Sequence, residues 1–114
     1  MIKDIITILF GNHRMLSDLN LVKTNYTIEM ENLTLLCNDE FFSKFKNDIQ
    51  DTRNALNNCL IRVSQLEEAI HEKDYNRCSV LVECLHAVDR DWLAKWDNLE
   101  ATLNNYLAEQ RASI

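Results

Sequence analysis

Apolar side chains recur at intervals of three and four residues in three long stretches of the chain. The first stripe contains Ile2, Ile5, Leu9, Asn12, Leu16, Leu19, Lys23, Tyr26, Met30, Leu33 and Cys37. The second contains Phe42, Phe45, Ile49, Thr52, Leu56, Cys59, Val63, Leu66 and Ile70. The third contains Cys78, Leu81, Leu85, Val88, Trp92, Trp96, Leu99, Leu103 and Tyr106. This spacing lines one face of a helix and is typical of coiled-coil packing, so it predicts three helices.

Polar residues separate the stripes at two places. Asn38 can cap a helix whose first turn holds Asp39 and Glu40, two acids that favour the positive end of the helix dipole. Lys73 suits the end of the second helix, and Asp74 can cap the third. The turns are therefore expected near residues 38 and 73.

The expected helices cover about residues 2–37, 39–72 and 74–110 of a single domain, 1–114. Each would be roughly 50 Å long at 1.5 Å per residue, and short connections force neighbours to run antiparallel. The fold class we expect is all-α: an elongated antiparallel three-helix bundle with coiled-coil-like packing.

A lone glycine, in a chain without proline, marks the one place where the first helix could break. Gly11 follows a run of apolar residues and precedes Asn12, and glycine costs a helix about 1 kcal/mol relative to alanine. A break there would create a short fourth segment. We expect a continuous first helix instead.

Pairing the helices about these turns gives an approximate register. Residue n of the first helix faces about 78 − n on the second and about 68 + n on the third. This places Trp92 and Trp96 near Tyr26 and Ile49, as an aromatic belt in the middle of the bundle.

Lys23 interrupts the first stripe with a charge. The register places it near Asp89 and Asp91, and a polar residue at a helix seam commonly fixes the alignment of the helices. We expect Lys23 to form such an ion pair.

The first helix carries more apolar surface than one seam can cover. Leu36, which lies outside the main stripe, and Leu33, which lies in it, are expected to add apolar surface beside the residues that we expect to bind a partner. The expected partner-binding residues are Ile2, Ile6, Ile8, Phe10, Leu21 and Ile28. Three arrangements would cover this surface: a central position of the first helix, a symmetric homodimer, or a different protein that lays a helix beside it.

Composition narrows the function classes. The hydrophobic fraction of 46% is that of a globular domain, and the net charge of −6 argues against direct nucleic-acid binding. No stretch approaches the roughly 18 apolar residues of a membrane span, and the first ten residues lack the pattern of a signal peptide, so a cytoplasmic location is expected. An acidic nucleic-acid mimic that inhibits a DNA-binding protein stays as an alternative.

Cysteine and histidine offer the one candidate metal constellation. His71, Cys78, Cys84 and His86 lie within sixteen residues, but a spacing of six turns the two thiols about 120° apart on a helix. A metal or cofactor bundle is therefore only an alternative, and neither metal nor cofactor is expected. Cys59 lies level with Cys84 in the register, so a thiol pair is conceivable, although free buried thiols are usual in a reducing compartment.

Catalytic motifs do not emerge from the sequence. A single glycine cannot build the phosphate-binding loops of nucleotide enzymes, which need at least two at fixed spacing. We therefore expect a non-enzymatic, protein-binding helical bundle of the adaptor, chaperone or inhibitor type, which captures a partner or its own copy through apolar contacts.

Replacing Ile6 and Phe10 together by Asp is expected to abolish this association and to leave the helical circular dichroism signal intact, because the two residues belong to the surplus apolar surface. Association that survives the double substitution would contradict the expectation.

Overall fold

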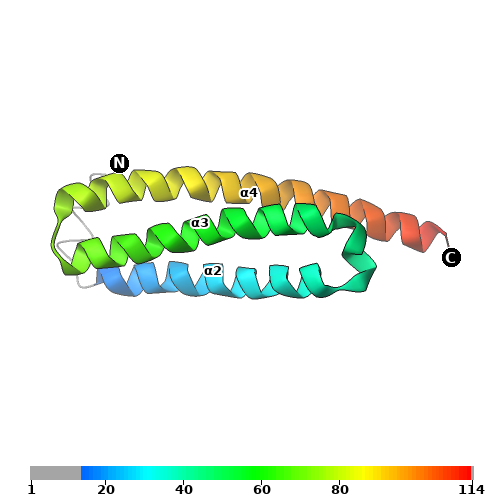
Figure 1. Ribbon diagram of the computed structural model, residues 1–114, viewed down its shortest axis with the longest axis horizontal. Helices are drawn as coiled ribbons and strands as arrows, with labels where there is room; N and C mark the ends of the chain where they lie inside the picture. Colours follow the sequence, from blue (N-terminus) through cyan, green and yellow to red (C-terminus); the bar gives the residue numbers. More distant parts are fainter. Residues whose placement is uncertain (1–13, 114) are drawn as a thin grey trace.

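Three long helices lie side by side in the computed structural model, which describes the backbone of residues 14–113 and the side chains of residues 16–113. The elements are α2 (Arg14–Asn38), the short 3-10 helix η1 (Glu40–Phe45), α3 (Lys46–His71) and α4 (Tyr75–Ala112). They form an antiparallel rod of 58 × 24 × 20 Å, in which α4 extends past the connection between α2 and α3 (Figure 1). The described residues contain no strand, and the predicted three-helix bundle is confirmed.

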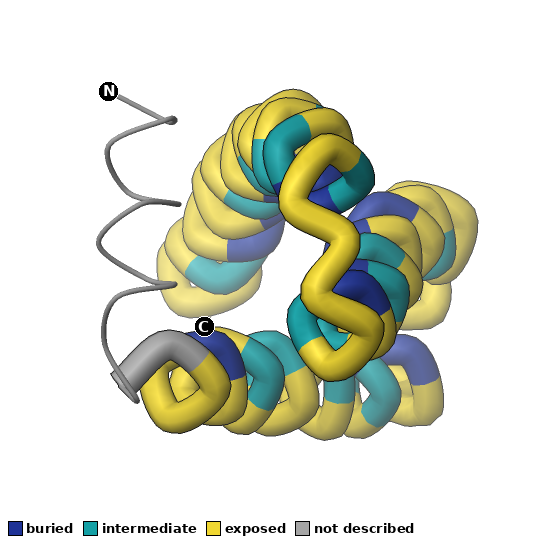
Figure 2. Tube along the Cα trace, turned by 90° about the vertical axis from the view of Figure 1, so that its left-hand side faces the viewer, coloured by how far each residue is buried: buried dark blue, intermediate teal, exposed yellow. Residues whose placement is uncertain are grey.

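The middle helix, α3, packs extensively against both of its neighbours. Viewed end on, the buried residues face the interior and the exposed residues face outward (Figure 2). The alternative that the first helix is the central one is therefore wrong for α2, which packs mainly against α3.

The predicted stripes supply the core. Six stripe residues are fully buried, and they come from α2, α3 and α4. They are Leu33, Ile49, Leu56, Cys59, Val63 and Cys78. The expected aromatic belt is also confirmed, because Trp92 and Trp96 pack with ring centroids 5.8 Å apart in one cluster with Tyr26 and Ile49.

The first connection differs from the prediction. Asp39, not Asn38, is the cap, and its carboxylate accepts a hydrogen bond from the Phe41 N–H at 2.9 Å. Residues 40–45 then form η1, so α3 begins at Lys46 rather than at residue 39. η1 is kinked at Phe42, whose φ of −103° and ψ of 17° are not helical.

An aromatic cluster explains the tighter turn. Phe41, Phe42 and Phe45 surround Tyr106 of α4, with ring centroids 5.2, 6.3 and 5.1 Å from the tyrosine ring. The Lys44 ammonium lies 5.5 Å from the centroids of both Phe45 and Tyr106. The free energy gained by packing these rings against α4 therefore exceeds the free energy that an ordinary helix through residues 39–45 would gain.

The longer connection shifts the register between α2 and α3 by about two and a half turns. The Cys37 thiol contacts the Gln50 side chain at 4.0 Å, so residue n of α2 faces about 87 − n instead of about 78 − n. Lys23 consequently pairs with Glu67, at 3.3 Å between Nζ and Oε1, and its predicted pairing with Asp89 or Asp91 is wrong.

The second connection follows the prediction. α3 ends at His71, Lys73 adopts a left-handed conformation with φ of 55°, and the Asp74 carboxylate caps α4 by accepting a hydrogen bond from the Arg77 N–H at 3.1 Å. α4, with 38 residues, is nevertheless longer than α3, with 26.

Replacing Leu56 by Ala should lower the free energy of unfolding by about 2–5 kcal/mol, because it opens a cavity at a fully buried position of α3. Chemical denaturation measures the loss. The matched control is Leu93→Ala on the exposed side of α4, where a change within about 0.5 kcal/mol is expected. Equal losses for the two variants would contradict this assignment of the core.

Candidate functional site

An apolar ridge runs along the outer face of α2. It consists of Leu21, Ile28 and Leu35, whose side chains are 61%, 48% and 70% exposed. Seven residues turn a helix through two turns less about 20°, so the three side chains form a nearly straight row. The buried residues Leu19 and Cys37 point to the opposite side of α2, toward α3.

The ridge contains two of the residues predicted to bind a partner. Leu21 and Ile28 are exposed, as that prediction requires. The other four lie outside the described residues: Ile2, Ile6, Ile8 and Phe10. Gly11 lies there as well, so the continuity of the first helix through it stays a prediction.

Two other sequence expectations for this helix are wrong, and one residue was missed. Leu33 is fully buried, and Leu36 packs against the core, so neither adds free apolar surface. Leu35 is the most exposed member of the ridge. Its signal in the sequence is the interval of seven residues that it shares with Leu21 and Ile28.

A shallow groove between α2 and α3 adjoins the ridge. Its lining comprises Thr27, Met30, Glu31, Thr34, Leu35 and Leu60. The Thr27 and Thr34 hydroxyls donate hydrogen bonds of 2.8 Å to the backbone carbonyls of Lys23 and Met30 in their own helix. Because these polar groups are already satisfied, the two threonines offer mainly their methyl groups to a molecule in the groove.

The apolar surface continues from this groove onto α3. Leu60 also lines a second depression, together with Ile61, which is 46% exposed. The ridge and the groove therefore form one surface across the two helices, which we call the α2/α3 face. Such a contiguous apolar area is more informative than single exposed residues elsewhere.

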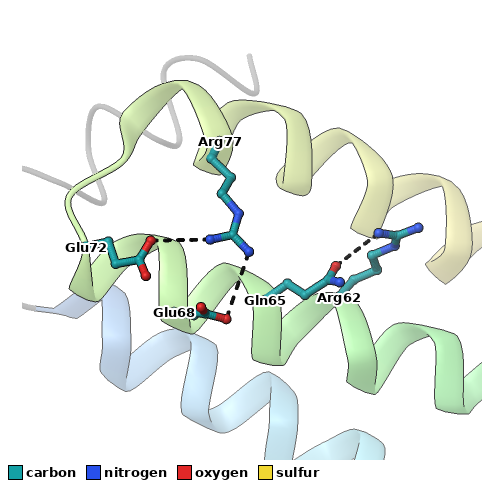
Figure 3. A network of polar contacts seen from close by, with 5 residues as sticks. All are labelled: Arg62, Gln65, Glu68, Glu72 and Arg77. Atoms are coloured by element: carbon teal, nitrogen blue, oxygen red, sulfur yellow. Dashed lines mark hydrogen bonds and ion pairs between the residues drawn. The ribbon is translucent and has the colours of Figure 1, made fainter.

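Some charged side chains elsewhere on the bundle form ion pairs. Arg77 of α4 reaches toward α3 and contacts Glu72 at 3.3 Å and Glu68 at 3.9 Å (Figure 3). Asp91 pairs with Lys95 at 2.8 Å. Most of the described acids lie outside these pairs, and the nucleic-acid-mimic alternative stays a prediction.

A polar cluster joins the three helices in the interior. The Tyr26 hydroxyl of α2 donates a hydrogen bond of 2.7 Å to Asp89 of α4, beside the fully buried Cys59 of α3. Burial and the nearby carboxylate raise the pKa of Tyr26. Burial, helped by Asp89 and opposed by the hydrogen bond with Tyr26, raises the pKa of Cys59 to about 11. The Cys59 thiol is therefore protonated and shielded near neutral pH, which makes it a poor nucleophile.

The candidate metal residues do not converge. His71, Cys78, Cys84 and His86 all lie within residues 16–113, where no group of three or more His, Cys, Asp or Glu side chains could hold a metal ion. Cys59 and Cys84 are free thiols, as are Cys37 and Cys78. Among the helices that the structure describes, none has the length and apolarity to cross a membrane.

The raised pKa of Cys59 predicts a loss of stability at alkaline pH. A thiol with an unfolded-state value of 9.0 and a native value of about 11 releases its proton more readily on unfolding, so the free energy of unfolding should fall from pH 9 to pH 11. Tyr26 acts in the same direction above pH 10, because its pKa is also raised. Denaturation curves recorded across this range measure the fall.

Cys59→Ala should make this fall shallower. Val63→Ala is the matched control, since it opens a cavity at an equally buried position of α3 but retains the thiol and the full pH dependence. Identical slopes for the two variants would show that Cys59 does not contribute.

Comparisons with known proteins do not assign this geometry to a family. No family model, curated protein or solved structure matches the chain. The inference of function therefore depends on the α2/α3 face itself.

Proposed function

We propose that the chain is a non-enzymatic protein-binding bundle and that its partner packs on the α2/α3 face. The observation that carries the proposal is the ridge of Leu21, Ile28 and Leu35, aligned on the side of α2 that faces away from the core. The exposure of three large apolar side chains to water is unfavourable in free energy. A partner that covers them removes this cost.

The form of the surface favours an elongated partner. The ridge extends over fourteen residues, or about 21 Å at 1.5 Å per residue. A helix is the element that commonly lies along such a row, with its own apolar side chains set into the adjoining groove. The groove wall at Leu35 and Leu60 provides that position on this chain.

Polar side chains beside the ridge can set the orientation of the partner. Glu31 and Asn32 are exposed and follow Ile28 by three and four residues, so they flank the row on its two sides. We expect the partner to place a donor group or a cation opposite the Glu31 carboxylate. Such contacts set the alignment of the two surfaces more than they add to affinity.

The proposed place of action is the cytoplasm. Four free thiols, three of them buried, are typical of a chain that folds in a reducing compartment. An adaptor, chaperone or inhibitor role is compatible with a partner held by apolar capture rather than by chemistry on a substrate.

Site-specific photocrosslinking tests the proposal. A photoreactive amino acid in place of Leu35, in the chain expressed in its native host, should give one discrete adduct with a protein, whether another protein or a second copy. The same group at Leu93 is the matched control, since Leu93 is also a half-exposed leucine but lies on α4. No adduct from position 35, or the same adduct from both positions, would overturn the proposal.

A further inference from the structure

We propose that the occupant of the α2 ridge is a second copy of this chain, docked with the two α2 helices parallel about a two-fold axis that runs along the ridge. The inference rests on the proposed function, which it deepens by naming the partner. It is argued from the spacing of the ridge and from the polar side chains that flank it.

The ridge is complementary to a copy of itself. Leu21, Ile28 and Leu35 follow one another at equal intervals of seven residues. When two copies of α2 run parallel, each of the three lies level with its own counterpart. Each residue then contacts the same residue of the other copy, which gives three apolar layers, as a symmetric interface requires.

The polar flanks distinguish parallel from antiparallel docking. On one side of the ridge lie Thr24 and Glu31, and on the other lie Asn25 and Asn32. A two-fold axis along the ridge brings opposite flanks together, so Glu31 of each copy lies opposite Asn32 of the other. An antiparallel dimer brings the same flank of both copies together, and there Glu31 lies opposite Thr24.

Asn32 can satisfy the carboxylate in the parallel arrangement. Its side chain is exposed and makes no hydrogen bond within residues 16–113, so its amide can donate to Glu31 of the second copy. Two such contacts form in each dimer.

Thr24 is a poorer donor in the antiparallel arrangement. Its hydroxyl already donates a hydrogen bond of 2.9 Å to the Asn20 carbonyl of its own helix. A hydroxyl has one proton to donate, so Thr24 would have to give up this bond to donate to Glu31. The flanks therefore favour parallel docking.

Among the described elements, α3 packs on the side of α2 that lies opposite the ridge. α3 packs against the inner side of α2, and Tyr26 reaches α4 from that same inner side. The groove between α2 and α3 runs from Thr27 to Leu35, beside the half of the ridge that Ile28 and Leu35 of the second copy would cover. Each copy has one such groove, and the two-fold symmetry places both grooves beside the interface.

The size of the ridge predicts a weak, reversible dimer. A strip about 21 Å long and about 10 Å wide is one helix face. This footprint is smaller than the roughly 800 Å² that each partner buries in a standard stable interface. Dimerisation is therefore expected to depend on protein concentration.

Sedimentation equilibrium of the purified full chain, at concentrations up to about 1 mM, tests the proposal. The wild type should dimerise reversibly, and Ile28→Asp should abolish dimerisation over this range, because it brings two carboxylates together in an apolar layer. Leu93→Asp is the matched control and should leave the dimer intact. Circular dichroism should show the same helicity in all three proteins.

Disulfide formation tests the orientation. In a parallel dimer, Leu35→Cys places two thiols at one level of the interface, whereas antiparallel docking about Ile28 would hold them about 21 Å apart. Mild oxidation should therefore convert Leu35→Cys to a covalent dimer at least about tenfold faster than Leu93→Cys. Equal rates for the two variants would overturn parallel docking.

Substitutions of asparagine test the polar contact. Asn32→Lys places an ammonium opposite Glu31 of the second copy and should tighten dimerisation roughly two- to tenfold, since each dimer contains two such pairs. Asn25→Lys is the matched control for net charge, because Asn25 lies opposite Thr24 in the parallel dimer. An equal effect of the two lysines would show that Glu31 and Asn32 do not face each other.

The outcomes separate this inference from the proposed function. A wild type that stays monomeric up to about 1 mM overturns the second-copy proposal, while an adduct of position 35 with a different protein would still support partner binding. A dimer that Ile28→Asp leaves intact places the contact elsewhere and overturns the second-copy proposal as well.

Discussion

The packing of α3 against both neighbours is the contact on which the rest of the bundle depends. α3 buries two flanks around a common centre at Leu56, Cys59 and Val63, and α2 and α4 each dock on one of them. A helix that packs on two sides keeps little exposed surface. α2 and α4 each pack mainly on one side, so each keeps an outer face in solvent, and on α2 that face carries the ridge.

Polar residues inside the bundle align the helices that apolar packing holds together. Apolar contacts are not directional, so a coiled-coil-like seam can slide by whole turns at modest cost. The hydrogen bond from Tyr26 to Asp89 joins α2 directly to α4 across the fully buried Cys59. At one end of the rod, the rings around Tyr106 fix the length of the connection. These two features together keep the outer face of α2 in one orientation.

Helix number, helix type and core positions could be predicted from the sequence, because periodicity alone decides which residues share a face. The alignment of α2 with α3 could not, since it depends on how many residues the first connection uses. Helical patterning continues through Phe42 and Phe45, yet these rings turn onto Tyr106, which lies 64 residues after Phe42 in the sequence. This alignment places Lys23 beside Glu67 of α3, while Tyr26, one turn further along α2, takes Asp89. The candidate surface was predictable in part, because Leu21 and Ile28 lie off the main stripe. Leu35 was missed because it lies two residues from Leu33, which is buried in the core. The seven-residue interval distinguishes the two, since Leu35 shares an orientation with Ile28 and not with Leu33.

Tyr26 and Ile28 lie within one turn of α2 but point in different directions, the first to Asp89 and the second to solvent. A partner that packs on Ile28 would therefore contact the turn of α2 that the hydrogen bond between Tyr26 and Asp89 already fixes in place. The ridge is thus presented from a fixed backbone, and little backbone entropy remains to be lost when a partner binds. A partner on the ridge would give α2 the second packed flank that α3 already has.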